Sequence, residues 1–272
     1  MQVQRLNVRP GERLVLDNVA SQQALLITAI HRGGAVKMNN SAATLVVCLR
    51  GNAIVNTSHG LFEISARRWL LVERESMPLI DISNLGSAWV IGVSGPLGRI
   101  IVPGSGKIPS FFFRRLRSLN AILKNSASLD DLPIDAEIDG ILDTLNLTQD
   151  TVTRVNRCPG RSQQRRLQVY ARLERARMLI EGNTDRIVGV TELADATHFS
   201  RWYLSRLFTQ VFGVSPQEYA IESRLRRARV LLERRAFSIG EIASRCGFEN
   251  QSAFARAFRR RFGCNASATR AS

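Results

Sequence analysis

The chain reads Leu204-Ser-Arg-Leu-Phe208 and then Phe212-Gly213, and fifty residues later it reads Phe254-Ala-Arg-Ala-Phe258 and then Phe262-Gly263. A Glu-Leu-Ala or Glu-Ile-Ala segment precedes each copy, at residues 192–194 and 241–243, with an offset of 49 residues. The difference of one residue falls in the turn that joins the segment to the copy. This repeat predicts two helix-turn-helix motifs, and sequence-specific DNA binding is the first functional hypothesis.

The positive charge of the 272-residue chain is concentrated around this repeat. The net charge is +15, and residues 152–272 carry 23 arginines and no lysine against 10 acidic residues, a net of +13. The asymmetry indicates an anionic partner for the C-terminal half. The alternative, a well-solvated basic surface, is disfavoured because the charge coincides with the repeated motif.

Capping residues and turn signals divide the C-terminal half into helices. We predict helices over residues 167–181, 191–196, 200–212, 216–233, 239–245 and about 250–262. Ser200 and Ser238 are the expected N-caps, and Pro216 takes the first position of the long fourth helix. That helix can hold two recognition helices about one DNA turn, roughly 34 Å, apart.

The helices that end at Phe212 and Phe262 are the predicted readers of the major groove. Arginine can donate two hydrogen bonds to guanine, glutamine can pair with adenine, and small side chains can contact the thymine methyl group. The predicted DNA-binding residues are Arg201, Trp202, Ser205, Arg206, Gln251, Ser252, Arg256 and Arg259. The arginines expected either to contact phosphates or simply to aid solubility are Arg226, Arg227, Arg229, Arg234, Arg235, Arg260 and Arg261.

Two of these assignments have structural alternatives. Trp202 can be a packed core residue instead of a DNA contact. Arg206 and Arg256 occupy equivalent positions in the repeat, and either one can form an internal salt bridge instead of contacting a base.

Short apolar or alternating runs, separated by glycine-containing turns, extend from about Leu14 to Val93. Examples lie at residues 24–30, 44–49, 69–72, 79–82 and 88–93. This spacing predicts a small β-barrel or β-sandwich. Two amphipathic helices are expected next, with stripes over residues 112–123 and 134–145. They can dimerise the protein or pack onto their own β domain, and dimerisation is slightly favoured.

No catalytic or metal constellation is visible in the N-terminal half. His31 and His59 lie in separate turns without a helpful carboxylate, and no phosphate-binding loop or nucleophile elbow is present. No metal, catalytic residue or cofactor is therefore predicted. The barrel interior can hold a small ligand or be filled by side chains.

The remaining signals concern organisation and compartment. We assign residues 1–150 to a sensing or dimerising domain, 151–164 to a linker with a Cys158-Pro159-Gly160 turn, and 165–272 to DNA binding. The basic linker is interpreted as a solvated hinge in preference to an auxiliary phosphate contact. No apolar run is long enough to span a membrane, and the four cysteines form no CxxC pair, so a cytoplasmic protein is expected.

Residues of about 165–272 resemble the DNA-binding domain of the AraC/XylS family of bacterial transcription regulators. Matching segments include Leu193-Ala194, Phe199-Ser200, Tyr203-Leu204, Arg224-Leu-Arg-Arg-Ala228, Cys246-Gly247-Phe248 and Gln251-Ser252. The resemblance implies two helix-turn-helix subdomains bridged by a long helix, and an activator that binds promoter DNA and touches RNA polymerase. It also implies a cupin-like N-terminal domain that responds to a small effector or to a protein partner and forms a homodimer.

The chain departs from the family pattern after the last Phe-Gly. Ala266 and Thr269-Arg270 stand where the family usually shows a proline and then a Tyr-Arg pair. The final short helix is therefore expected to fray. Two rival functions remain for the whole chain: a nonspecific nucleic-acid binder, and a cupin-type enzyme fused to a DNA-binding tail.

Overall fold

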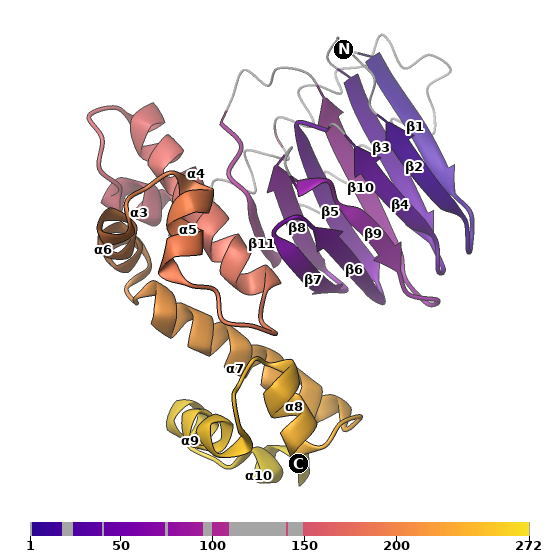
Figure 1. Cartoon of the computed structure of the whole chain (residues 1–272). Helices are drawn as coiled ribbons and strands as arrows, with labels where there is room; N and C mark the ends of the chain where they lie inside the picture. Colours follow the sequence, from indigo (N-terminus) through magenta and orange to yellow (C-terminus); the bar gives the residue numbers. More distant parts are fainter. Residues whose placement is uncertain are drawn as a thin grey trace. The chain divides into compact units, whose positions relative to one another are not determined.

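The computed structural model describes residues 2–17, 24–39, 41–73, 76–94, 100–108, 140 and 149–271. The chain forms two compact units, Met1–Glu174 and Arg175–Ser272, and the division falls within helix α4 (Gln163–Gly182). Figure 1 shows a β-rich N-terminal unit and a helical C-terminal unit. These two classes of structure confirm the predicted α+β composition.

The N-terminal unit is a sandwich of two sheets that lie face to face (Figure 1). One sheet has the order β1 (Gln2–Val8), β3 (Ala24–His31), β10 (Ser87–Ser94), β5 (Ala43–Arg50), β8 (Arg68–Glu73) and β11 (Gly104–Lys107). The other has the order β2 (Arg13–Asp17), β4 (Ala35–Asn39), β9 (Leu79–Ile82), β6 (Asn52–Thr57) and β7 (Gly60–Ser65). Of the two predicted architectures the sandwich is correct and the closed barrel is wrong, because each sheet keeps two separate edge strands among the described residues.

The burial pattern of each strand follows from its place in the sandwich. β6 and β7 alternate between exposed and buried residues, as expected for strands with one face in the core. β5 lies between β10 and β8 and is almost continuously buried. The five predicted apolar runs lie in β3, β5, β8, β9 and β10, whereas β1 and β11 fall outside the predicted range.

The predicted helices over residues 112–123 and 134–145 lie outside the described residues, apart from residue 140. Helix α3 (Gln149–Arg157) follows them and ends before the predicted turn at Cys158-Pro159-Gly160. Part of the predicted linker, 151–164, is therefore helical.

The C-terminal unit begins within α4 and continues through six further helices. They are α5 (Val190–Thr197), α6 (Arg201–Phe212), α7 (Pro216–Arg234), α8 (Ile239–Arg245), α9 (Gln251–Phe262) and α10 (Ala266–Ala271). Side-chain oxygens cap the helices: Ser200 Oγ accepts from the Tyr203 N–H, and Ser215 and Ser238 form reciprocal capping boxes with glutamates. The predicted caps at Ser200 and Ser238 and the start at Pro216 are confirmed.

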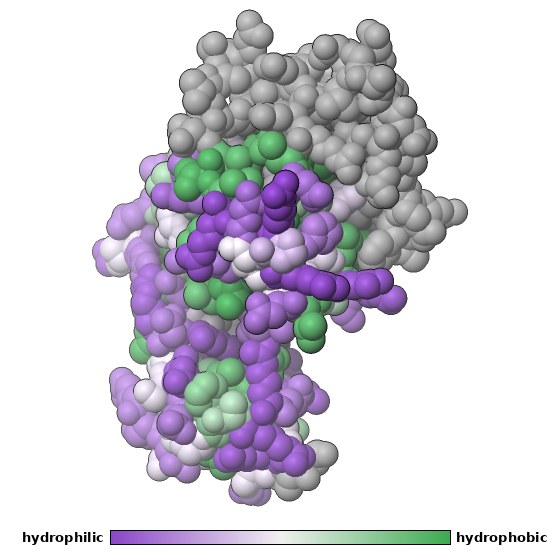
Figure 2. Space-filling view, turned by 90° about the vertical axis from the view of Figure 1, so that its right-hand side faces the viewer, coloured by the Kyte–Doolittle hydropathy of each residue, from purple (hydrophilic) through white to green (hydrophobic). Residues whose placement is uncertain are grey.

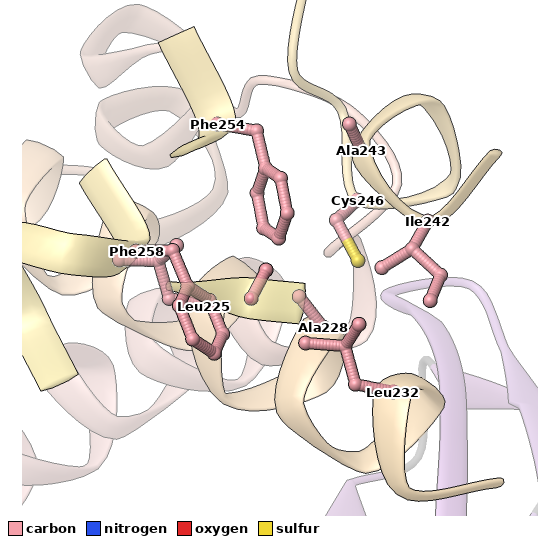
Figure 3. Close-up of a cluster of buried hydrophobic side chains, with 9 residues drawn as sticks. Leu225, Ala228, Leu232, Ile242, Ala243, Cys246, Phe254 and Phe258 are labelled. Carbon is pink, nitrogen blue, oxygen red and sulfur yellow. The ribbon is translucent and has the colours of Figure 1, made fainter. Parts of the chain in front are cut away.

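Helix α7 runs from the α5–α6 pair to the α8–α9 pair (Figure 1), and each pair packs its own core against it. In the first pair the predicted inward residues of α6 are buried, and they are Leu204, Leu207, Phe208 and Val211. Figure 3 shows the second core, where Phe254 and Phe258 of α9 point toward Leu225 of α7 and Cys246. Burial in this core raises the pKa of the Cys246 thiol to about 11. Cys246 therefore packs as a small apolar residue of the core.

The expectation that the C-terminal end frays is wrong. Residues 266–271 form α10, and the methyl group of Ala266 is buried in the second core. The Asn265 carbonyl accepts the N–H groups of Ala268 and Thr269 at 3.1 and 3.2 Å, which closes the first turn without the usual proline. The helix packs against α7 and α9 through Ala266, while Ser267 and Ala268 are exposed.

Candidate nucleic-acid interface

Helix α6 exposes the face opposite its buried core. Arg201, Trp202 and Arg206 are exposed and Ser205 is partly exposed. Trp202 is 68% exposed, so the alternative that it belongs to the core is wrong. The Arg206 guanidinium lies over the Trp202 ring at 5.3 Å from its centroid, which places a cation and an aromatic surface side by side.

Helix α9 also has one face buried in a core and the opposite face exposed. Asn250 Oδ1 accepts from the Ala253 N–H at 2.8 Å and so fixes the start of the helix, which the sequence placed at about residue 250. Phe254 and Phe258 face the core. The predicted binding residues of α9 are all exposed, and they are Gln251, Ser252, Arg256 and Arg259.

The two equivalent arginines, Arg206 and Arg256, have no carboxylate partner in the described ranges. Among the residues that the structure describes, neither Arg206 nor Arg256 forms a salt bridge, which removes the alternative of an internal ion pair. Both guanidinium groups are available for a ligand on the exposed faces. Figure 2 shows that hydrophilic residues cover most of the visible surface at the C-terminal end, with small apolar patches between them.

Several arginines outside these two faces are held by intramolecular contacts. Arg226 and Arg261 both pair with Glu222, with nitrogen–oxygen distances of 3.6 and 2.7 Å. Arg229 Nε lies 3.4 Å from Oε1 of Glu233, four residues later in the same helix. These exposed pairs are weak, and they reduce the number of arginines that are free to contact a ligand.

Sequence reasoning missed a buried polar cluster between α4 and α7. Tyr219 Oη and Arg177 Nη1 both donate to Glu181 Oε1, at 2.5 and 2.7 Å. Burial by itself raises the pKa of Glu181, but the Arg177 guanidinium, the Tyr219 hydroxyl and the Arg226 charge together hold that pKa below its usual value. The sequence signal was weak, because Glu181 and Tyr219 are 38 residues apart.

This cluster predicts a stability that decreases in acid. A carboxylate whose pKa is lowered by folding stabilises the fold above its unfolded pKa near 4.5, and that stabilisation is lost as the pH falls through the folded pKa. Glu181→Gln is expected to lower the free energy of unfolding by about 1.5–3 kcal/mol at pH 7 and to reduce its dependence on pH below 5. Urea unfolding at pH 7 and pH 4 measures both effects.

The matched control is Glu233→Gln, which removes an exposed carboxylate of α7. Its effect is expected to stay within about 0.5 kcal/mol at both pH values. Equal losses in the two variants at pH 7 would contradict a stabilising role for the buried cluster.

In the described part of the N-terminal unit, no group of three or more His, Cys, Asp or Glu side chains gathers as a metal site would require. The His59 ring forms a hydrogen bond with Ser76 Oγ at 3.1 Å. The buried hydroxyls of Thr28 and Ser41 make no hydrogen bond to any residue that the structure describes. None of the helices in the described ranges combines the length and apolar character needed to cross a membrane.

Comparisons with known proteins assign the C-terminal helices to a family. A family model described as a helix-turn-helix domain matches residues 193–272, which include α6 and α9. The chain carries an AraC-type helix-turn-helix domain. The predicted resemblance to the AraC/XylS family is thereby confirmed for this part of the chain.

The relatives named here match a limited part of the chain. The HTH-type transcriptional regulator GbdR of Pseudomonas aeruginosa is 40% identical over 85 residues, which cover 31% of this chain and 23% of the relative. ExsA of the same species is 45% identical over 64 residues, 24% of this chain and 23% of the relative. A solved AraC-type regulator from Chromobacterium violaceum is 35% identical, with a TM-score of 0.36 over 37% of this chain and 89% of the other. The match to GbdR and ExsA thus spans about a quarter of their length.

Proposed function

We propose that the protein is a sequence-specific transcription regulator that reads double-stranded promoter DNA with α6 and α9. The observation that carries this proposal is the repetition of one arrangement, in which Arg206 and Arg256 lie exposed opposite buried phenylalanines. A helix of this kind fits the major groove and presents arginine to guanine. Relatives whose names describe transcriptional regulators are 40% and 45% identical over 85 and 64 residues, which supports the proposal.

The contacts divide into two kinds. The eight predicted DNA-binding residues of α6 and α9 are proposed to read bases. Arginines without a carboxylate partner among the described residues, such as Arg235 and Arg260, are proposed to contact phosphates, which contribute affinity without sequence information. The net charge of +13 in residues 152–272 supports a strong dependence of binding on salt.

The N-terminal part is proposed to control this reader. We assign residues 1–150 to effector sensing and homodimerisation, 151–164 to a linker and 165–272 to DNA binding. The sandwich interior, with the unpaired hydroxyls of Thr28 and Ser41, supports binding of a small polar effector. A cytoplasmic activator that contacts RNA polymerase, without enzymatic activity, completes the proposal.

Selection of duplexes from a random-sequence library by the full-length protein tests this function. The expected result is enrichment of a site with two short elements about one helical turn apart. Affinity for that site at a stated salt concentration is expected to exceed affinity for random DNA by roughly a thousandfold or more. Equal affinities would favour the nonspecific binder, and turnover of a substrate by purified protein with bound metal would favour the cupin-type enzyme.

A further inference from the structure

The turn of the second helix-turn-helix pair lies directly against a loop of the first. A Cβ atom added to Gly247 would lie 2.9 Å from the carbonyl oxygen of Asp185 and 3.0 Å from the amide nitrogen of Arg186. Both are backbone atoms, so the loop cannot yield by a side-chain rotation. Gly247 also has φ +68°, a conformation that favours glycine.

The loop at residues 183–186 is fixed to the first helix-turn-helix pair. Asn183 Nδ2 donates to the Leu179 carbonyl at 2.8 Å, at the end of α4. Arg186 donates twice to the Glu192 carboxylate of α5, at 2.8 and 2.6 Å. A bidentate pair of this kind restrains orientation as well as distance, so the loop moves together with α4 and α5.

Helix α7 binds both sides of this contact through two arginines one turn apart. Arg224 Nη1 donates to the Gly247 carbonyl, and Arg227 Nη1 donates to Thr184 Oγ1, each at 2.9 Å. The Arg224 side chain is buried and lies over the Phe248 ring, and its Nε makes no hydrogen bond to the described part of the chain. Burial of an unpaired N–H is costly, and the hydrogen bond to the Gly247 carbonyl and the contact with the Phe248 ring offset that cost.

We propose that this clamp between the two helix-turn-helix pairs, formed by Thr184, Asp185, Arg224, Arg227 and Gly247, sets the spacing between the two DNA elements that one chain accepts. The inference rests on the proposed function. One added base pair moves an element about 3.4 Å along the DNA and rotates it by about 34–36°. A pair of readers clamped to each other cannot follow that movement, whereas an unclamped pair joined only by α7 can adjust.

The test uses the full-length protein and the two-element duplex that it selects, with the spacer shortened or lengthened by one base pair. The natural sequence is expected to bind the altered duplexes roughly 10- to 100-fold more weakly than the selected one. Gly247→Ala forces the turn and the loop apart, and it is expected to reduce this difference to less than about threefold.

The matched control is Gly263→Ala. Gly263 has φ +73°, close to that of Gly247, but nothing lies within 4 Å of an added Cβ atom. The control therefore carries the same backbone strain without the clash, and it is expected to keep the full spacing difference.

Thr184→Val provides a second variant, because it removes the acceptor of Arg227 and preserves side-chain volume. It is expected to reduce the spacing difference in the same direction, and it decides the question if circular dichroism shows that Gly247→Ala is unfolded. An undiminished spacing difference in Thr184→Val and in folded Gly247→Ala would overturn the clamp. If the natural sequence selects no two-element site, the proposed function itself fails.

Discussion

Replacing Phe258 with alanine is expected to lower the free energy of unfolding of the C-terminal unit by about 3–5 kcal/mol. The ring is fully buried in the second core and contacts the rings of Phe254 and Phe262, with centroid distances of 5.5 and 4.6 Å. Because a domain is typically stable by only about 5–15 kcal/mol, this loss removes a large part of the total. Urea unfolding followed by circular dichroism measures it.

Trp202→Ala is the control for this prediction. It also removes an aromatic ring, but that ring is mostly exposed, so its effect on unfolding is expected to stay within about 0.5 kcal/mol. Similar unfolding midpoints for Phe258→Ala and the natural sequence would show that α9 does not depend on this core.

Replacing Arg256 with alanine is expected to weaken binding to the selected site by about 1–3 kcal/mol, roughly 5- to 150-fold. The side chain is exposed on α9 and forms no salt bridge in the described part of the chain, so its removal leaves the fold intact. Arg206→Ala removes the equivalent group from α6 and is expected to act similarly at the other element. Fluorescence anisotropy with selected and random duplexes at one salt concentration measures the loss.

Arg260→Ala supplies the contrast, because it removes the same charge from the same helix at a proposed phosphate contact. It is expected to weaken binding to selected and random duplexes alike and to reduce the salt slope by about 0.9. If Arg256→Ala also weakened both duplexes equally, Arg256 would be a phosphate contact and not a base reader.

The sequence alone determined the helices α5 to α9 and, to within one residue, their ends. Ser200, Ser238 and Pro216 act on the backbone groups within one turn of themselves, so their role can be read locally. The buried positions of α6 and α9 followed from helical spacing, and the exposure of Arg206 and Arg256 followed from the same spacing. The DNA-binding assignment depends on these local features and on the charge.

Only the tertiary structure decided how distant segments meet. The sequence could not separate a barrel from a sandwich, because alternating strands suit both and only the pairing of edge strands distinguishes them. The sequence favoured a DNA contact for Trp202 and left a core position as the alternative, and only the packing of α6 showed that its side chain is exposed. The bond from Tyr219 to Glu181 and the contact of Gly247 with Asp185 join residues 38 and 62 positions apart. Such contacts depend on the path of the whole chain, which local propensity does not encode.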